Sequence, residues 1–448
     1  MQDTSSRAAL IRQALIDTDH SDPTIQVIGK HRKMAENPFR FLRGSAGLFY
    51  ADFKQQHIQL PDALFTWPLT MVIGDCHLAN FGLFTEDGSS GDRVKFGPND
   101  FDDACIGHAV WDLVRLSVSL ILAADYCRGV QQGIYPADEL VITRKDHVTS
   151  EAGALAAVRA FLLAYQQQLA TIARDPEQRF AVLDHFEKGH VLRPLLKKTI
   201  KRSVIGEQFL QKSTLAKNVD LQQRPLRFID KPGRFERLSD DETAKLADAF
   251  APYMSDCILD IVARHGAGTG SLNMQRYYVL VGPAQIQHSD DFALCHLVEI
   301  KQQRDAAPLA FFRELSPMNR LNAAHLTVDC QRQMLRRPDL VLDELIYNEQ
   351  PFLVRSLHHA SVDIGPEDVC VHAEDADLSL FQYAQACGRA LALVHSRGDR
   401  RSTRFEQQVS QSLHQHLSEL ETACQHYAQQ VINDYVWLKS HVERHTNG

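Results

Sequence analysis

The chain has 448 residues, of which 44% are hydrophobic, and it carries a formal net charge of −8 at pH 7. This length suffices for a large apolar core and more than one sub-domain, and the acidic balance gives no electrostatic footprint for nucleic-acid binding. Its nine cysteines form no Cys-x-x-Cys pair, which favours reduced, buried thiols in a cytoplasmic protein over a disulfide framework.

The N-terminal segment is expected to form a helix over Ser6–Ile16, followed by a polar linker. Met1–Asp22 has no apolar centre, so we expect no signal peptide. The longest apolar stretch, near Leu116–Ala124, is too short to span a bilayer, so we expect no membrane partner. Residues 31–56 carry apolar side chains at helical spacing, and Pro38 suits the first turn of a helix.

Two short buried strands are expected at 69–74 and 94–101, separated by a polar turn at Asp87–Asp92. A strong helical pattern follows over Trp111–Ala124. The middle of the chain, about 137–250, is expected to be mainly helical.

Beyond residue 255 the pattern changes to β-type runs. Four strands are expected, at Tyr277–Val281, His296–Ile300, Leu340–Ile346 and Pro351–Leu357. A helix over Asn319–Arg337, ended by Pro338, separates the two pairs. Two helices complete the chain, one over Leu378–His395 and a long one over Phe405–Val442.

These elements predict an α+β fold with five regions. They are an N-terminal helix and linker (1–30), a part with polar motifs (31–130), a helical region (131–254), a β-rich region (255–358) and C-terminal helices (359–448).

The most informative motif is Gly74-Asp75-Cys76-His77-Leu78-Ala79-Asn80, which follows an apolar run. A second acidic group, Asn99-Asp100-Phe101-Asp102-Asp103, follows the next expected strand. Phosphoryl-transfer enzymes combine a carboxylate that orients the nucleophile with an Asn and an Asp that hold Mg²⁺. The pattern predicts Asp75 as catalytic base beside Asn80, with oxygen ligands for Mg²⁺ from Asn80, Asp100 and Asp102. The alternative is that Asp75 and Asn80 only cap and turn a loop.

A glycine-rich segment, Gly266-Ala267-Gly268-Thr269-Gly270-Ser271-Leu272, precedes the strand at Tyr277–Val281. Alternate glycines let backbone N–H groups approach a phosphate closely, so the candidate nucleotide contacts are Gly266, Gly268, Thr269, Gly270 and Ser271. No Gly-Lys-Ser/Thr follows, so the segment is not a Walker A loop, and it does not open a helix as a dinucleotide fingerprint would. A flexible hairpin is the alternative.

Lys301 ends the expected strand that follows the glycine-rich segment by one hairpin. In protein kinases a strand lysine at this position in the order reaches the nucleotide phosphates, and an acid on the next helix pairs with it. Asp329 is the acid available on the helix expected here. The alternative for Lys301 is a solvated surface charge.

His395-Ser396-Arg397-Gly398-Asp399 is a rival catalytic loop, but Arg404 stands where a kinase-type loop needs asparagine. We therefore keep the Asp75 loop as catalytic; His395 and Asp399 either support it or merely end a helix at Gly398. The basic side chains of Lys197, Lys198, Lys201 and Arg202 are either a solvated helix face or, together with Arg43, contacts for an anionic acceptor.

At these residues the chain resembles the uncharacterised bacterial family numbered 2252 among the domains of unknown function (DUF2252). The resemblance covers about residues 30–400. It rests on Lys33–Met34, Pro38–Gly44, Gly74–Gly82, Asn99–Ala104, Trp111–Leu116, Gly268–Leu272 with Arg276–Tyr277, Glu299–Lys301 and Gly388–Asp399.

The same motifs are similar to the aminoglycoside-phosphotransferase branch of the protein-kinase-like fold. That resemblance implies a large helical lobe and a small β-rich nucleotide lobe. It also implies Asp75 as catalytic base, Asn80 and Asp100 as metal ligands and Asp112 as a structural carboxylate.

The chain departs from these relatives in composition and in order. Asn273 replaces a frequent glycine, and Gln302 replaces an acidic residue. The glycine-rich segment and Lys301 follow Asp75 by about two hundred residues, whereas a kinase has its nucleotide lobe first. We therefore expect a circular permutation, with a hinge near Pro351–His359; it requires Lys301 to lie near Asp100, within about 10 Å.

The expected function is that of a cytoplasmic, ATP- or GTP-dependent phosphotransferase that uses Mg²⁺ and acts on an unidentified hydroxyl acceptor, either a small molecule or a protein. Three alternatives stay open. The first is a nucleotide-binding pseudokinase or partner-binding module, and the second is a nucleotidyl (AMP) transferase that binds the nucleotide in reverse. The third is a metallophosphoesterase, suggested by Asp75-x-His77, although its Gly-Asn-His and Gly-His-x-His segments do not occur.

Overall fold

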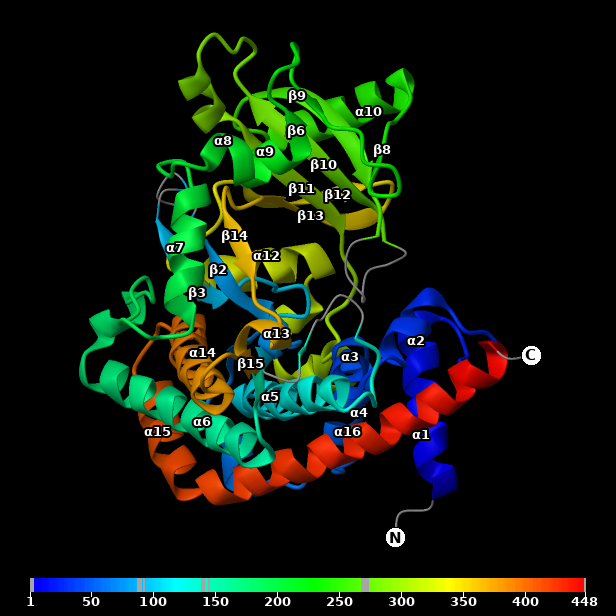
Figure 1. Ribbon diagram of the computed structural model, residues 1–448, viewed down its shortest axis with the longest axis vertical. Helices are drawn as coiled ribbons and strands as arrows, with labels where there is room; N and C mark the ends of the chain where they lie inside the picture. The colour runs from blue at the N-terminus through cyan, green and yellow to red at the C-terminus, as the bar shows by residue number, and fades with distance from the viewer. Residues whose placement is uncertain are drawn as a thin grey trace.

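The structure is a computed structural model that describes residues 4–86, 91, 93–137, 142–143, 146–266 and 274–446. It is a mixed α+β fold, 54% helical, with one six-stranded sheet and several small sheets. The expected α+β class is therefore confirmed. The six-stranded sheet and the segments packed on it, residues 204–266, 274–302 and 340–357, form what we call the small lobe. The remainder, the large lobe, is mainly helical and lies below it in Figure 1.

Both ends of the chain contribute to the large lobe. Its helices are α1 (Thr4–Asp19), α2 (Gly29–Met34), α3 (Pro38–Gly44), α4 (Ala46–Lys54), α5 (Ala109–Gln131), α6 (Glu151–Arg174), α7 (Leu192–Arg202), α11 (Leu309–Phe312), α12 (Ala323–Met334), α13 (Pro366–Val369), α14 (Ala376–Gly398), α15 (Arg404–Gln415) and α16 (Leu417–Thr446). Helix α5 is buried along most of its length and contacts α3, α6 and α16, and α14 packs along α6. Helix α3 begins as expected at Pro38, where the Asn37 side chain caps the first turn.

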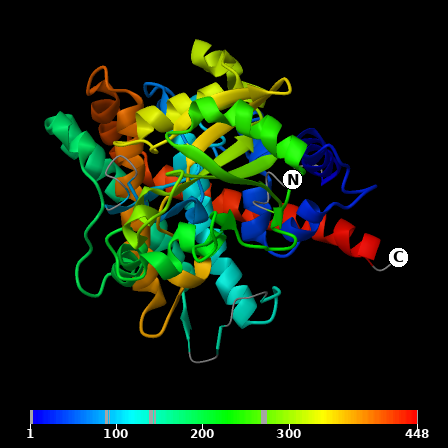
Figure 2. The ribbon, with the colours of Figure 1, turned by 90° about the horizontal axis from the view of Figure 1, so that it is seen from above.

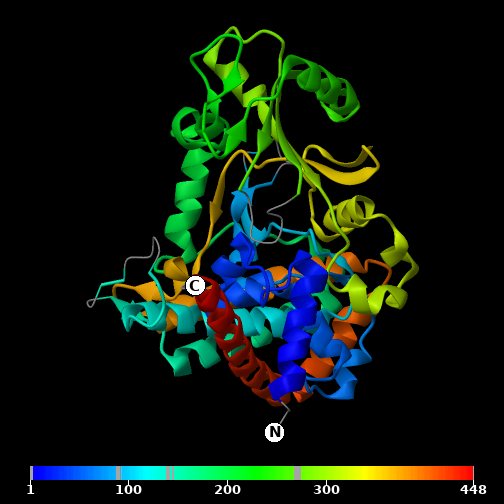
Figure 3. The ribbon, with the colours of Figure 1, turned by 90° about the vertical axis from the view of Figure 1, so that its right-hand side faces the viewer.

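Helices α1 and α16 lie side by side, although they are the first and last elements of the chain (Figures 1 and 3). Arg7 of α1 joins them, because its guanidinium donates to Asp52 of α4 and to Asp434 of α16, each with one bond of 3.0 Å. The two ends of the chain are therefore fixed to each other within one lobe.

The small lobe is an antiparallel sheet in the order β12-β13-β11-β10-β9-β8. Its strands are β8 (Phe235–Glu236), β9 (Cys257–Arg264), β10 (Arg276–Gly282), β11 (His296–Gln302), β12 (Leu342–Tyr347) and β13 (Gln350–Ser356). Segments before β9 pack on it, namely α8 (Phe209–Lys212), α9 (Thr214–Asn218), β6 (Val219–Asp220) and β7 (Arg227–Phe228), which precede β8, and α10 (Asp240–Phe250), which follows it. Seen from above, this lobe covers the centre of the large lobe (Figure 2).

The two faces of the sheet differ in character because side chains alternate along each strand. One face carries Val279, Ile300 and Val354, which pack against Phe250 of α10. On the opposite face, register pairs Arg276 with Lys301 and Glu299 with Arg355. The charged face is turned toward the large lobe, where the candidate site lies.

Small sheets connect the lobes. β1 (Thr70–Val72) pairs with β4 (Cys105–Gly107), β2 (Phe81–Thr85) and β3 (Val94–Pro98) form a hairpin, and β14 (Ser361–Asp363) adds to β2. A further pair joins β5 (His147–Val148) to β15 (Val371–His372). Since β14 follows β13 after only residues 357–360, the sheet of the small lobe is tied directly to the hairpin β2-β3.

Three expectations need correction. The helix expected over Phe405–Val442 is two helices that meet at His416, because α15 packs on α6 whereas α16 runs along α5 and α3. The helix expected over Asn319–Arg337 begins only at Ala323, where Asn322 caps it. The same helix also ends earlier than expected, at Met334 rather than at Arg337, whereas residues 351–356 form strand β13 as expected.

The part of the expected 131–254 region that follows residue 204 packs on the sheet and is not purely helical. Strands β2 and β9 were not expected. Strand β2 has five residues, all buried, whereas β9 has eight residues and is only partly buried. All nine cysteines are free, and all but Cys257 are buried, as the sequence predicts. Within the described ranges, none of the helices has the length and apolar character needed to cross a bilayer.

Candidate active site

The loop that follows β1 is held in place by a buried carboxylate. Asp112, on α5, accepts hydrogen bonds from the backbone N–H groups of Ile73 (2.7 Å) and Gly74 (3.1 Å). Gly74 has φ +81°, and a Cβ there would lie 1.9 Å from the Asp103 carbonyl oxygen. Only glycine fits both conditions. The loop therefore leaves the strand in one fixed direction and presents Asp75 to the space above α5.

The two expected catalytic residues, Asp75 and Asn80, lie together. The Asn80 side-chain amide donates to the Asp75 carbonyl oxygen at 2.6 Å. Arg115 donates from Nε to Asp75 Oδ1 at 2.7 Å. The second oxygen, Oδ2, lies 3.7 Å from Nε2 of His77, and the Asp75 side chain is 22% exposed. One carboxylate oxygen is thus fixed by arginine while the other faces the cavity.

The second acidic group meets the first through the backbone. The Asn99 N–H donates to the Asn80 carbonyl oxygen at 3.1 Å, which brings Asp100 next to Asn80. Burial raises the pKa of Asp100, but the nearby Lys301 and Arg355 outweigh this and lower it below its ordinary value. Asp100 is therefore ionised at neutral pH.

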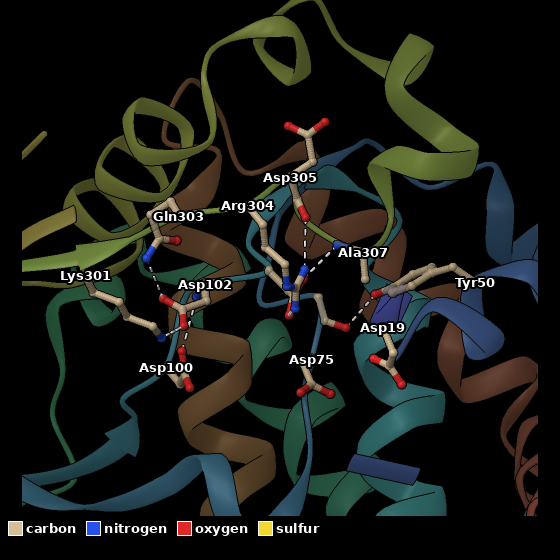
Figure 4. Close-up of polar contacts among 12 residues, drawn as sticks. Asp19, Tyr50, Asp75, Asp100, Asp102, Lys301, Gln303, Arg304, Asp305 and Ala307 are labelled. Atoms are coloured by element: carbon tan, nitrogen blue, oxygen red, sulfur yellow. Dashed lines mark hydrogen bonds and ion pairs between the residues drawn. The ribbon is translucent and has the colours of Figure 1, made fainter. Parts of the chain in front are cut away.

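Lys301 from the sheet reaches this acidic group (Figure 4). Its ammonium forms an ion pair with Oδ2 of Asp102, while Gln303 donates to Oδ1 of the same carboxylate at 3.2 Å. The expectation that an acid on the following helix pairs with Lys301 is wrong, because Asp329 of α12 contacts His325 and Arg332 instead. Burial lowers the pKa of Lys301 to about 8, although Asp100 acts in the opposite direction.

Behind Lys301 the charged face of the sheet forms a second layer. Glu299, buried on β11, contacts Arg276 at 3.1 Å and Arg355 at 3.0 Å. Arg355 also donates to the Asn99 carbonyl oxygen at 3.3 Å. The sheet is thereby connected to the backbone beside Asp100.

Asp103 joins the site to the segment after β11. Arg304 donates two bonds to it, of 2.8 and 3.0 Å, and the Ala307 N–H donates a third of 2.7 Å (Figure 4). Both oxygens of Asp103 are therefore engaged by protein groups, as are those of Asp102. Among the acids of this group, Asp100 is the best placed to bind a cation.

These residues line one cavity of about 470 Å³ between the lobes. This volume lies within the usual range of ligand pockets, roughly 300–1,000 Å³. The polar residues at its centre are Asp75, His77, Asn80, Asp100, Asp102, Arg276, Lys301, Gln303 and Arg355. Residues about two hundred positions apart in the chain thus share one cavity.

The other sequence candidates either do not line the cavity or lie outside the described residues. Gly266 has φ +69°, at the end of β9, whereas Gly268, Thr269, Gly270 and Ser271 lie outside the described residues. His395 is buried and contacts Asp112 Oδ2 at 3.0 Å and Tyr165 at 2.9 Å, so it supports the loop from below. Arg397 donates to backbone carbonyls and Asp399 pairs with Arg401; neither lines the cavity.

The residues present fit a magnesium ion that shares its shell with phosphates. Within the described part of the chain, no group of three or more His, Cys, Asp or Glu side chains is arranged to hold a metal. Mg²⁺ commonly takes only one or two protein carboxylates and completes its shell with phosphate oxygens and water. Asp100 and the amide oxygen of Asn80, which both line the cavity, could supply such a partial shell.

The sequence model of one family, described as "Uncharacterized protein conserved in bacteria (DUF2252)", matches residues 24–133 and 137–441. The chain belongs to the DUF2252 family. Comparisons with curated proteins and with solved structures gave no match. In this DUF2252 protein the match includes the cavity residues from Lys30 to Arg355, whereas Ala14, Asp17, Thr18 and His20 of the lining precede it.

Sequence reasoning missed three residues of the site in this DUF2252 protein: Arg115, which binds Asp75 without lining the cavity, and the lining residues Gln303 and Arg304. Arg115 follows Asp112 within a helix whose pattern is otherwise apolar, and a charge at such a position was the available signal. Gln303 and Arg304 directly follow Lys301, and their roles depend on carboxylates from the other half of the chain. No local pattern could have indicated those partners.

Proposed function

We propose that this DUF2252 protein is a phosphotransferase of kinase-like fold that uses ATP or GTP with Mg²⁺. The main support is the ion pair between Lys301 and Asp102, residues 199 positions apart, beside Asp100 in the cavity that Asp75 and Asn80 also line. Kinase chemistry needs this set of groups in one place: a strand lysine, a metal-binding Asp and Asn, and a carboxylate for the nucleophile.

Each residue has a distinct role in the proposal. Lys301 would hold nucleotide phosphates, and Asn80 and Asp100 would hold the Mg²⁺ that neutralises charge on them. Asp75 would accept a hydrogen bond from the acceptor hydroxyl through Oδ2, since Arg115 fixes Oδ1. Asp102 would position Lys301, and the lysine would exchange this contact for a phosphate when the nucleotide binds.

The order of elements supports a permuted kinase-like arrangement. Strands β9 and β10 are joined through the glycine-rich segment, β11 carries Lys301, and helix α12 and strands β12 and β13 follow. The catalytic-loop residues precede all of these in the chain. Arg7 fixes α1 to α16, so the beginning and the end of the chain meet in the large lobe. A chain in which the catalytic-loop residues precede the nucleotide-binding strands can therefore still form one large lobe.

Three rival functions use some of the same observations. The hydrogen bond from Arg115 to Asp75 favours an inactive protein that binds nucleotide, because it occupies one oxygen of the proposed catalytic carboxylate. Nucleotidyl transfer would use the same residues with the nucleotide reversed. A metallophosphoesterase has less support, because no group of metal-binding side chains surrounds His77 among the described residues.

A thermal-shift titration tests the proposal. We expect ATP or GTP with Mg²⁺ to stabilise the wild-type protein by about 2–4 kcal/mol at saturation. Lys301→Ala should lose most of this stabilisation. Lys217→Ala, a lysine outside the cavity, is the matched control and should keep it. An absence of any nucleotide effect on the wild type would refute the proposal, and mass spectrometry of products separates transfer of phosphate from transfer of AMP.

The lowered pKa of Lys301 predicts a pH dependence. Above about pH 8 the amine loses its charge in the folded protein, so the affinity for ATP·Mg²⁺ should fall as pH rises from 7 to 9.5, by up to about tenfold per unit. Without nucleotide, the free energy of unfolding should instead rise between about pH 8 and 10.4, because the unfolded chain then binds more protons. Calorimetric titrations across this range measure the affinity. Lys301→Arg should flatten the profile, and an equal slope in that variant would contradict this assignment.

A further inference from the structure

The cavity extends beyond Asp75 into a chamber walled by the large lobe. Small side chains form most of this wall: Ala14, Gly44, Ala46, Gly47, Ala306, Ala307 and Ala310. Helix α1 contributes Ala14, Asp17 and Thr18, which lie on one helical face. On the proposed function this is the acceptor side, because Ala307 and Asp19 of α1 lie past Asp75 as seen from Lys301 (Figure 4).

The wall formed by α1 is fixed rather than free. Arg7 ties the beginning of the helix to α4 and α16, and Asp19 at its end accepts from Lys30 and contacts His31 at 3.2 Å. At Gly47 the helices are so close that a Cβ would lie 2.7 Å from the Thr18 hydroxyl oxygen. A closed wall of this kind suits a small acceptor better than a protein segment.

Arg43 is the one cation of this cavity without an ion pair in the part of the chain that the structure describes. It lies in the last turn of α3, lines the cavity, and its Nε is buried without a hydrogen-bond partner among the described residues. The other lining cations all have acidic partners: Lys30 with Asp19, Arg276 and Arg355 with Glu299, Lys301 with Asp102, Arg304 with Asp103, and Arg313 with Asp305.

The nearest strong negative influence on Arg43 is Asp75, and Arg115 already neutralises that carboxylate. Arg43 is half-buried and lies over the Phe39 ring, 5.9 Å from its centroid, but its buried Nε has no hydrogen-bond partner among the described residues. Such an arrangement is unfavourable unless an anion completes the hydrogen bonds of the guanidinium. Guanidinium groups bind carboxylates and phosphates with two parallel bonds. The basic stretch near Lys197 does not line the cavity, so it is not the counterpart of such a ligand.

We infer that Arg43 binds an anionic group, a carboxylate or a phosphate, on a small hydroxyl-bearing acceptor whose hydroxyl is directed at Asp75. This inference rests on the proposed function for the role of Asp75 and adds the chemical class of the substrate. Arg43 would then decide acceptor affinity and leave nucleotide affinity unchanged.

The test measures nucleotide and anion binding separately on the full chain. Thermal shift with the non-hydrolysable analogue AMP-PNP and Mg²⁺ reports the nucleotide side. With that side saturated, sodium phosphate or sodium malonate is titrated against sodium chloride of equal ionic strength. We expect saturable stabilisation of the wild type, an apparent affinity at least about tenfold lower in Arg43→Gln, and no change in Arg40→Gln. Arg40 lies on the same helix, pairs with Glu36 and does not line the cavity.

Each outcome decides the inference. An anion response in Arg43→Gln equal to the wild type overturns it, as does a wild type that responds no more to phosphate or malonate than to chloride. Loss of the AMP-PNP response in Arg43→Gln would assign the residue to the nucleotide and also overturn it. An Arg43-dependent anion response without any nucleotide response would support the anion site and refute the proposed function. Should Arg43→Gln not melt cooperatively, Arg43→Lys must lower the affinity for phosphate, because it keeps the charge but lacks the planar fork.

Discussion

Replacing Asp100 by asparagine should abolish the Mg²⁺-dependent reaction with ATP while the protein stays folded. Asparagine keeps an oxygen that can accept the bond from the Asp102 N–H (3.2 Å), so the local backbone retains its partner. The substitution removes the one charged ligand proposed for Mg²⁺. Because electrostatic stabilisation of the transferring phosphate is lost, we expect the rate of Mg²⁺-dependent ADP release to fall roughly 10²–10³-fold.

The matched control for this change is Asp305→Asn. Asp305 lines the same cavity but pairs with Arg313 and lies away from Lys301 (Figure 4). Its loss removes an equal charge from the cavity and should leave ADP release unchanged. Equal losses in both variants would mean that the net charge of the cavity matters rather than a ligand. Full activity of Asp100→Asn, with thermal melting unchanged, would refute the metal role.

The sequence allowed the long, strongly patterned elements to be predicted. Trp111–Ala124 and Leu378–His395 carry sustained helical periodicity, and both are helices, α5 and α14, that extend a few residues further. The break at His416 could not be predicted, because neither proline nor glycine marks it and α15 and α16 diverge to pack on different partners. Strand β2 was hidden because it follows the Asp75 loop at once and is buried on both faces, without alternation.

At the site, the spacing of residues in the sequence indicated which side chains take part but not which other side chains they contact. Asp75, Asn80 and Asp100 follow strand ends, so their proximity could be anticipated from local order. Lys301 was linked to them only by comparison with the order of parts in kinases. That Asp102, rather than Asp329, pairs with Lys301 depends on how the sheet lies over the large lobe. Such contacts between distant segments are set by tertiary packing and leave no local pattern in the sequence.

Asp112→Ala should be among the most destabilising single changes in the large lobe. The carboxylate is fully buried and serves three groups: the N–H of Ile73, the N–H of Gly74 and Nε2 of His395. Alanine would leave all three without this partner in a site that water does not reach. Each unsatisfied buried group costs about 1–3 kcal/mol, so we expect the free energy of unfolding to fall by about 4 kcal/mol. That is a large share of the roughly 5–15 kcal/mol that stabilises a domain.

Urea unfolding measures this loss, provided that the m-value stays constant. Asp125→Ala is the control on the same helix: Asp125 is half-buried and accepts one bond, from the Tyr135 hydroxyl at 2.9 Å, so its loss should cost about 1 kcal/mol. Asparagine at position 112 has the same shape as aspartate but offers one oxygen for two backbone donors. The loss in the free energy of unfolding for Asp112→Asn should therefore lie between those of the two alanine variants. If Asp112→Ala lowers the free energy of unfolding no more than Asp125→Ala does, the loop does not depend on the Asp112 carboxylate. A folded Asp112→Asn variant should also bind ATP·Mg²⁺ more weakly, because Asp75 and Asn80 are aimed by the backbone that Asp112 holds.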